Sequence, residues 1–220
     1  MPGSSHDRLR SALLALPAGG AFLDLGAGDG HLGREVAGHF AHVAGVEQDA
    51  AVRPPIGAYD EWVVDSVAGV ESWSRTFDAV VCADVLEHLP DPVPVLARVR
   101  SWISPGGRLF VSVPNVANVA VRLSLLAGRF EYADRGILDR THLRFFTRRS
   151  ARRLVEGAGF RIVRILPTPI PAELAFAPLR RPPLRGVSRG LFRLAARVWP
   201  TLFGYQFLIE AEPAESPDHS

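Results

Sequence analysis

Lysine is absent from this 220-residue sequence, which has only one cysteine and one methionine. The lone Cys82 cannot form an internal disulfide, so the sequence predicts a protein of a reducing compartment, and we expect a cytoplasmic location. The polar first ten residues lack the apolar core of a signal peptide. The longest early uncharged stretch, residues 11–23, is too short to span a bilayer and contains a proline and two glycines. These absences argue against a transmembrane protein.

The small net charge of +2 hides an uneven distribution of charge along the chain. Residues 1–97 hold 14 acidic and 5 basic side chains, whereas residues 98–220 hold 9 acidic and 20 basic ones. A basic half can face an anionic substrate, a membrane surface or nucleic acid, and an acidic half can receive a cationic ligand. The hydrophobic content of 47% fits one globular domain with a real core.

Short apolar runs alternate with helical patterns along the chain. Runs of strand length lie at residues 22–25, 42–46, 62–64, 77–82, 109–113, 161–166 and 205–211. Apolar residues at three- and four-residue spacing predict helices at 7–16, 32–40, 93–103 and 148–158. Such alternation implies right-handed parallel crossovers. We therefore predict an α/β fold, with a seven-stranded, mostly parallel sheet and helices on both faces.

Two segments do not fit this alternation. Residues 115–147 are too long for a plain connection and include an apolar helix candidate at 116–127, so we expect a lid. Residues 167–204 carry arginines every four residues, at Arg185, Arg189, Arg193 and Arg197. Such a basic amphipathic stretch is typical of a cap on its own domain or of a membrane-surface contact. We predict one domain over residues 1–220, with its core at about 20–166 and 205–211 and these two segments as insertions.

A glycine-rich loop joins the first predicted strand to the helix that follows. Its sequence, DLGAGDG at residues 24–30, lets the backbone turn tightly and approach a ligand closely. Gly28, Gly30 and Gly33 also match the dinucleotide fingerprint G-x-G-x-x-G, and Glu47 lies at a suitable distance to bind a ribose. The loop therefore predicts a nucleotide-like cofactor without identifying it.

Acidic residues narrow the choice of cofactor. Asp24, Glu47, Asp65 and Asp84 lie at or near the carboxyl ends of four successive predicted strands, the edge at which open α/β sheets bind ligands. Four carboxylates disfavour a pyrophosphate, but they can accept hydrogen bonds from an ammonium group and from ribose hydroxyls and attract a sulfonium. S-adenosylmethionine carries all three groups. Any one of these acids can still be only a helix cap or a turn former.

Five motifs in this order resemble those of class I S-adenosylmethionine-dependent methyltransferases: DLGAGDG, GVEQD, VVDS, FDAVVCADVLEHLPDP and SPGGRLFVSVPN. The resemblance covers about residues 20–166 and implies the Rossmann-like fold of that family. It also implies which residues hold the cofactor: Asp24, Gly26, Gly28 and Gly30 beside its amino acid part, Glu47 at the ribose, Asp65 and Ser66 at the adenine, and Cys82, Ala83 and Asp84 at the methionine end.

Methyl transfer to a hydroxyl needs a base near the methyl group. His142 lies in a dense polar stretch at 136–147 that closes the predicted lid, and we predict that it is the general base. His88, which follows the fourth strand, is the second candidate, although it can equally cap the next helix. A metal is the other route, because Asp84, Glu87 and His88 could hold Mg²⁺, which would polarise an acceptor hydroxyl.

The stretch at 136–147 also resembles a subgroup of bacterial methyltransferases that modify hydroxyls of sugars, glycans and natural products, including enzymes of mycobacterial polymethylated polysaccharides. That resemblance implies sugar O-methylation in polysaccharide biosynthesis, with a small or oligomeric saccharide as the acceptor. The acceptor would contact polar and aromatic residues of the lid: Phe130, Tyr132, Asp134, Asp139, Arg140 and Arg144. Each of these residues can equally be lid scaffolding.

Two alternatives stay open at this point. The first is methylation of an aromatic or quinone-like acceptor, which the apolar insertions and the basic stretch would suit. The second is a non-catalytic binding module that keeps the cofactor fold and docks on a membrane or a protein. Nucleic acid is not an expected substrate, since the sequence has no recognisable nucleic-acid-binding motif and no pocket motif for a flipped base.

Overall fold

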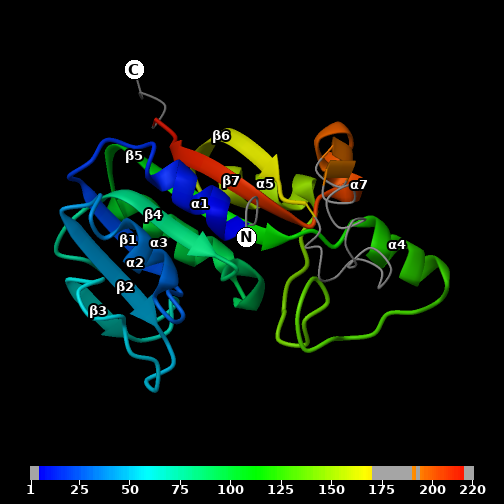
Figure 1. The fold of residues 1–220 in the computed structure, drawn as a ribbon, viewed down its shortest axis with the longest axis horizontal. Helices are drawn as coiled ribbons and strands as arrows, with labels where there is room; N and C mark the ends of the chain where they lie inside the picture. Colours follow the sequence, from blue (N-terminus) through cyan, green and yellow to red (C-terminus); the bar gives the residue numbers. More distant parts are fainter. Residues whose placement is uncertain (1–4, 170–189, 192–193, 216–220) are drawn as a thin grey trace.

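One seven-stranded sheet runs through the computed structural model of the chain, which describes residues 5–169, 190–191 and 194–215 (Figure 1). In chain order the strands are β1 (Ala21–Leu25), β2 (His42–Glu47), β3 (Glu61–Val64), β4 (Phe77–Ala83), β5 (Ile103–Pro114), β6 (Phe160–Pro167) and β7 (Gln206–Pro213). Their order across the sheet is β3-β2-β1-β4-β5-β7-β6, with β7 antiparallel to both of its neighbours. The α/β class and the mostly parallel sheet are confirmed.

The helices are α1 (Ser5–Leu13), α2 (His31–Val36), α3 (Pro92–Trp102), α4 (Val119–Leu126), α5 (Arg148–Gly157) and α7 (Pro200–Phe203), with a short 3₁₀ helix, η1 (Leu86–His88). Local sequence explains several starts: Asp91 caps α3 just before Pro92, and Thr147 forms a capping box with Ser150 at α5. The helix predicted at 32–40 ends earlier, at Val36, where Gly38 lowers the helix propensity.

Helices cover both faces of the sheet and create two hydrophobic cores. On one face, α3 and α5 bury side chains such as Val99 and Val155 against the sheet. On the other face, α1 and α2 bury Leu13 and Val36. Neighbouring strand residues alternate between the two cores, so that Leu23 contributes to the first and Phe22 to the second. Strands buried on both faces explain why the sequence shows them as continuous apolar runs.

The segment after β5 leaves the sheet beyond the carboxyl ends of its parallel strands, where Figure 1 shows α4 and the following loop projecting from the body of the molecule. Asn118 caps α4, so this helix begins later than the predicted 116–127. The loop returns to the sheet through a bridge between Asn115 and Phe146. We refer to residues 115–147 as the lid segment. Of the second insertion, the residues at 170–189, with Arg185 and Arg189, and Arg193 lie outside the described residues.

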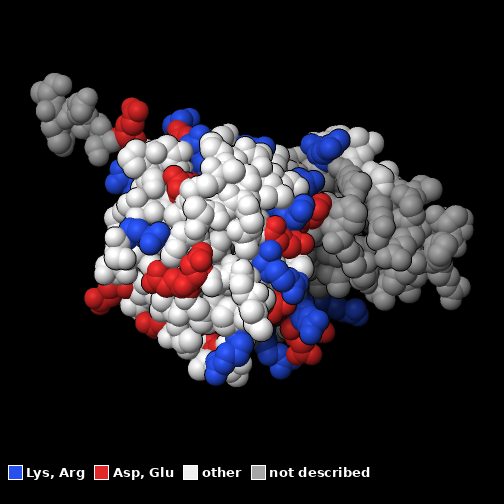
Figure 2. Space-filling model, turned by 60° about the vertical axis from the view of Figure 1, so that its left-hand side comes forward, with Lys and Arg blue, Asp and Glu red and all other residues white. Residues whose placement is uncertain are grey.

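Charges of both signs lie side by side on the face drawn in Figure 2, so the uneven distribution along the sequence does not give a block of one sign on that face. Cross-strand ion pairs use part of the basic excess: Arg108 and Arg161 both pair with Glu212, and Arg164 pairs with Glu210. Among the described residues, no helix is long and apolar enough to cross a membrane.

Candidate active site

A cleft of about 400 Å³ opens at the carboxyl ends of the parallel strands. It is lined by residues at or after the ends of β1, β2, β3 and β4 and by one residue of the lid segment: Gly26, Glu47, Gln48, Ser66, Val67, Asp84, Val85, His88, Leu89 and Thr141. A larger cleft of about 1030 Å³ lies near the start of β5, where Arg108 and Arg161 are already paired with Glu212. The smaller cleft is therefore the better candidate site, since its position is the ligand edge of an open α/β sheet.

The glycine loop after β1 forms one wall of this cleft. Gly26, Gly28 and Gly30 have φ angles of 72°, 55° and 71°, a region that side chains disfavour. A Cβ atom at Gly26 would lie 2.5 Å from Val85, whereas the space beside Gly28 is open. The Gly28 N–H donates a 2.8 Å hydrogen bond to Glu47 Oε2, and the Asp49 N–H donates to Glu47 Oε1 at 2.9 Å. Glu47 thus ties the glycine loop to the end of β2.

Asp24 lies beneath the loop and is only 3% exposed. The Tyr59 hydroxyl donates a 2.8 Å hydrogen bond to its Oδ2 atom. Burial raises the pKa of Asp24 to about 6, although the Tyr59 hydrogen bond acts in the opposite direction. Near neutral pH this carboxyl is therefore ionised in a nearly dry position, where a cationic ligand would stabilise it.

Asp84 stands at the end of β4 in a strained left-handed conformation, with a φ of 54°. Two side chains hold its Oδ1 atom at 2.8 Å each: the Ser112 hydroxyl on β5 and the Gln206 amide on β7. Desolvation by the surrounding protein raises the pKa of Asp84, and the hydrogen bonds from Ser112 and Gln206 oppose this rise. The residue still faces the open cleft. Its backbone strain and its two donors fix the direction of the carboxylate.

A cluster of Glu87, His88 and His142 lies next to Asp84, with ligand-forming atoms within 4.8 Å of one another. The His88 and His142 rings meet edge to face at 4.9 Å, which brings the lid segment onto η1. Glu87 is fully buried, and neither carboxyl oxygen has a hydrogen-bond partner among the described residues. Burial, together with the charge of Asp84, raises the pKa of Glu87 to about 9. A buried carboxyl without partners needs a proton or a cation.

Backbone carbonyls define the tautomers of the two histidines. His142 Nδ1 lies 3.1 Å from the Ile137 carbonyl oxygen, and His88 Nδ1 lies 3.2 Å from that of Thr141. A carbonyl oxygen only accepts, so each Nδ1 carries the hydrogen and each neutral ring keeps its lone pair on Nε2. Both Nε2 atoms can therefore take a proton or bind a metal. The structure brings together the two predicted catalytic histidines and two of the predicted metal ligands.

The remaining lid residues proposed to bind an acceptor have partners within the protein. Arg140 pairs with Asp134, and both side chains are strongly exposed. Asp139 accepts hydrogen bonds from the Thr141 N–H and hydroxyl, which lower the pKa of Asp139. Arg144 donates to the Pro90 carbonyl oxygen. These contacts favour lid scaffolding, the alternative that the sequence left open. The exposed Phe130 and Tyr132 pack edge to face, with ring centroids 5.5 Å apart.

Some predicted cofactor residues have other positions. Cys82 is fully buried in the core that α3 and α5 cover, so its side chain does not line the cleft, and only its backbone could contact a ligand there. Burial also raises the pKa of the Cys82 thiol to about 12. Ala83 is half-buried beside it. Ser66 lines the cleft, but Asp65 faces a neighbouring hollow and accepts a hydrogen bond from the Ser66 N–H.

Three residues of the site were not among the predicted site residues: Tyr59, Ser112 and Gln206. Tyr59 reaches Asp24 across 35 positions of the chain, and Gln206 reaches Asp84 across 122 positions. Neither belongs to a motif, and each acts through a contact that only the folded sheet creates. Ser112 lies inside an apolar run, where it is completely buried. An isolated polar residue in such a run is the nearest to a signal that the sequence offered.

Replacing Glu47 by alanine is expected to weaken binding of S-adenosylmethionine or S-adenosylhomocysteine by about 1 to 3 kcal/mol for each charged hydrogen bond that is lost. The variant lacks a ribose acceptor and also loses the bond that Glu47 makes with the Gly28 N–H. Calorimetric titration measures the effect. Asp49→Ala is a suitable control, because it leaves the backbone N–H that Glu47 binds. Equal affinities of wild type and Glu47→Ala would contradict the assignment.

Comparison with known proteins adds a family to this geometry. The family model described as "Methyltransferase domain" matches residues 4–165, well over half of the chain. The magnesium protoporphyrin IX methyltransferase from Synechocystis PCC 6803, solved with bound SAH, resembles the fold with a TM-score of 0.64 and 18% identity. That alignment covers 96% of this chain and 82% of that protein.

Curated relatives include two ubiquinone biosynthesis O-methyltransferases. The one from Aeromonas salmonicida is 32% identical over 159 residues, which cover 64% of this chain and 65% of that protein. The one from Xanthomonas axonopodis pv. citri is 31% identical over 138 residues, covering 57% of this chain and 55% of that protein. This chain therefore spans less than two thirds of the length of either relative.

Proposed function

The chain belongs to the methyltransferase domain family, and we propose that it transfers a methyl group from S-adenosylmethionine to a hydroxyl of an aromatic, quinone-like acceptor. One observation carries the proposal: the cleft at the strand ends is lined by the acidic residues Glu47 and Asp84 and by His88, whose ring contacts His142 of the lid segment. The acids suit the cofactor and the histidines suit removal of a hydroxyl proton. NAD is not expected to bind, because its pyrophosphate would meet Glu47 and Asp84 in the cleft, with Asp24 beneath the loop.

The residues of the cleft fit the cofactor by charge and by shape. The open space beside Gly28 lets a ligand approach the backbone of the loop. Glu47 uses one lone pair of each oxygen on backbone N–H groups and can accept further bonds from the ribose hydroxyls. The carboxylate of Asp84, fixed by Ser112 and Gln206, suits the ammonium group of the methionine end.

His142 would act as the general base. As the acceptor oxygen forms a bond to the methyl carbon, the carbon–sulfur bond breaks and its electron pair returns to sulfur. His142 Nε2 takes the hydroxyl proton, so the products are a methyl ether and neutral S-adenosylhomocysteine. The Ile137 carbonyl holds the ring in the tautomer that this step needs. Nearby Asp84 lies close enough to stabilise the imidazolium that forms.

A divalent cation is the second candidate for activating the hydroxyl, and the unpaired oxygens of Glu87 are the observation that favours it. Glu87, His88 and His142 would hold the ion, with Asp84 next to them. The metal site predicted at Asp84, Glu87 and His88 stays a prediction, to which the structure adds His142, and two imidazoles with one carboxylate suit Zn²⁺ better than the predicted Mg²⁺. Both histidines already donate Nδ1–H to carbonyls, the usual arrangement of a metal-binding imidazole. When bound, the cation would supply positive charge that lowers the pKa of the acceptor hydroxyl.

The choice of an aromatic acceptor rests on the relatives and on the lid. The two curated relatives are named for ubiquinone biosynthesis, and none of these names refers to a sugar. The lid segment exposes large apolar side chains, with Leu126 84% and Tyr132 55% exposed. Such a surface suits an acceptor with an apolar ring or tail. Asp134 and Arg140 pair with each other, so fewer polar groups of the lid segment are free to bind a saccharide. The saccharide acceptor stays a prediction.

Acceptor profiling tests the proposal. We expect methyl transfer from labelled S-adenosylmethionine to polyprenylated or alkylated catechols, and at least about tenfold lower kcat/KM with mono- and oligosaccharides. Calorimetry should detect binding of S-adenosylhomocysteine and none of NAD. Preferred methylation of a saccharide would overturn the aromatic acceptor but keep the enzyme class. Absence of transfer to both acceptor classes, with cofactor binding retained, would favour a non-catalytic binding module.

A further inference from the structure

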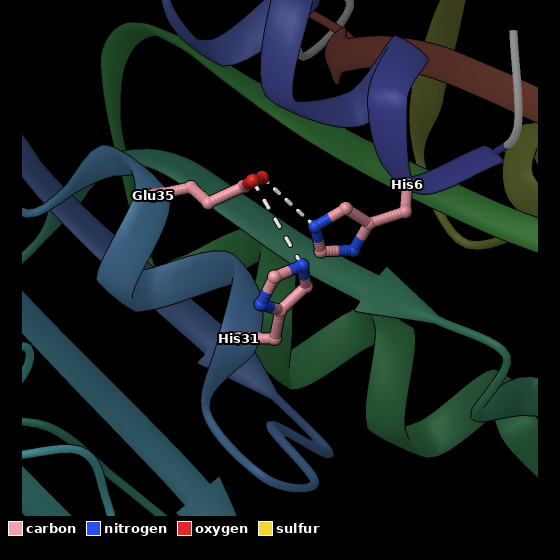
Figure 3. Close-up of side chains that lie close together, drawn as sticks. All are labelled: His6, His31 and Glu35. Carbon is pink, nitrogen blue, oxygen red and sulfur yellow. Dashed lines mark hydrogen bonds and ion pairs between the residues drawn. The ribbon is translucent and has the colours of Figure 1, made fainter. Parts of the chain in front are cut away.

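Two histidines and a glutamate converge between α1 and α2, on a part of the surface that the active-site cleft does not include. His6 lies on α1, and His31 and Glu35 lie on α2 (Figure 3). His6 Nε2 is 3.0 Å from Glu35 Oε2, and His31 Nε2 is 3.8 Å from Glu35 Oε1. The imidazole rings stack at 4.5 Å with an angle of 21°. One nitrogen of each ring is therefore directed at the same carboxylate.

The spacing of these atoms fits a small metal ion. One ligand-forming atom of each residue lies within 4.8 Å of the other two. Tetrahedral Zn²⁺ with bonds of about 2.0 to 2.2 Å holds its ligand atoms about 3.3 Å apart, so only small side-chain movements are needed. His31 and Glu35 are four residues apart on one helix, so they share a helix face. The second helix then contributes His6 as the third ligand.

We propose that His6, His31 and Glu35 form a binding site for Zn²⁺ or a similar nitrogen-preferring transition-metal ion, with water completing its coordination. Two imidazoles and one carboxylate are a common ligand set of three-ligand zinc sites. Magnesium and calcium prefer oxygen ligands and are not expected to bind here. All three side chains are between 30% and 45% exposed, so an ion can enter from solvent and water can reach it.

Two arginines compete with the ion. Arg34 Nη2 donates to His31 Nδ1 at 2.7 Å, so the neutral ring carries its hydrogen on Nε2, the nitrogen that faces Glu35. Metal binding therefore requires this hydrogen to move to Nδ1 and Arg34 to turn away. Arg10 lies 3.6 Å from Glu35 and adds a second positive charge. Because Arg34 is exposed, it can turn into solvent, and its removal should strengthen metal binding.

The position of the cluster gives the bound ion a structural effect. His31 is the first residue of α2 and directly follows Gly30 of the glycine loop. An ion held by His6 and His31 would fasten α1 to the start of α2. We therefore expect zinc to raise the melting temperature as well as to bind.

Calorimetric titration of the full chain with ZnCl₂, in a buffer without chelating components, tests the site. The active-site cluster could also bind zinc, so the titration uses the Glu87→Gln/His88→Ala variant as its background. In that background we expect one zinc per chain, more than about tenfold weaker binding after His6→Ala or Glu35→Gln, and tighter binding after Arg34→Ala. Circular dichroism verifies that each variant is folded.

His6→Ala should weaken zinc binding, and Arg34→Ala should strengthen it. These opposite changes in affinity identify the site, because a cluster with only a structural role would not produce them. Cobalt gives an independent readout, since ligation by His6 and His31 should produce visible absorption bands that His6→Ala lacks. Zinc affinity unchanged by both His6→Ala and Glu35→Gln would overturn the proposal. So would the absence of any zinc binding to the Glu87→Gln/His88→Ala background.

Discussion

Replacing His142 by alanine is expected to lower kcat by about 10² to 10⁴, because a positioned base contributes a factor of this size to a rate. Cofactor affinity should change little, since the glycine loop and Glu47 are the proposed cofactor-binding elements. Steady-state kinetics, with calorimetry of cofactor binding, measures both effects.

His39→Ala is a matched control for this experiment. His39 hydrogen-bonds the Leu16 carbonyl oxygen, outside the residues that line the cleft, and its loss should leave kcat nearly unchanged. Near-normal turnover of His142→Ala with the true acceptor would exclude both proposed roles of His142 and shift attention to His88. A chelator separates the two roles. An unchanged wild-type rate supports the base alone, whereas a lost rate that a divalent cation restores supports a metal.

Replacing Asp24 by asparagine is expected to raise the free energy of unfolding at pH 8 by at most about 3 kcal/mol. The folded chain keeps the Asp24 proton up to a pKa of about 6, whereas the unfolded chain loses it near the ordinary value of 3.8. The folded state therefore binds more protons between these values, and stability falls as pH rises from about 4 to 6. Above pH 6 the loss is complete. Asparagine does not titrate and still offers an oxygen to Tyr59.

Chemical denaturation of wild type and Asp24→Asn at pH 4 and pH 8 measures this effect. The two proteins should be similar at pH 4 and should differ at pH 8, with the variant more stable. Tyr59→Phe provides the control, because it leaves Asp24 ionisable but without its hydrogen-bond donor and should steepen the loss of stability with pH. Parallel pH dependence of wild type and Asp24→Asn would contradict the burial argument. Asp24→Asn should also bind the cofactor more weakly, so the variant gains stability and loses affinity.

The strands of the sheet were the most predictable part of the fold. Strands buried on both faces read as continuous apolar runs, so all seven predicted positions hold a strand. Strand order and the direction of β7 depend on pairing between distant segments and left no local pattern. The irregularity at 104–107, between the residues of β5 that pair with Phe77 and Ala79, contains Pro105, Gly106 and Gly107, which are typical of a turn but here lie within a strand.

The meeting of acidic residues at one edge of the sheet was predictable for a topological reason. Alternating strands and helices bring the carboxyl ends of β1, β2 and β4 to one edge, so Asp24, Glu47 and Asp84 meet there. Cys82 failed as a lining residue because neighbouring residues of a strand point to opposite faces, and its side chain belongs to the core. The meeting of His142 with His88 depends on the path of the lid segment, which no spacing rule determines.

The place of β7 in the sheet also has a consequence for chain synthesis. This strand follows β5 and β6 along the chain, yet it lies between them in the sheet and supplies Gln206 to Asp84. A nascent or truncated chain without β7 would leave the facing edges of β5 and β6 unpaired and would lack one of the two donors that orient Asp84. Open strand edges promote aggregation, so such products should be short-lived in the cell. The same strand joins β5 to β6 and completes the set of donors around Asp84, so sheet assembly and the geometry of the candidate site both depend on β7.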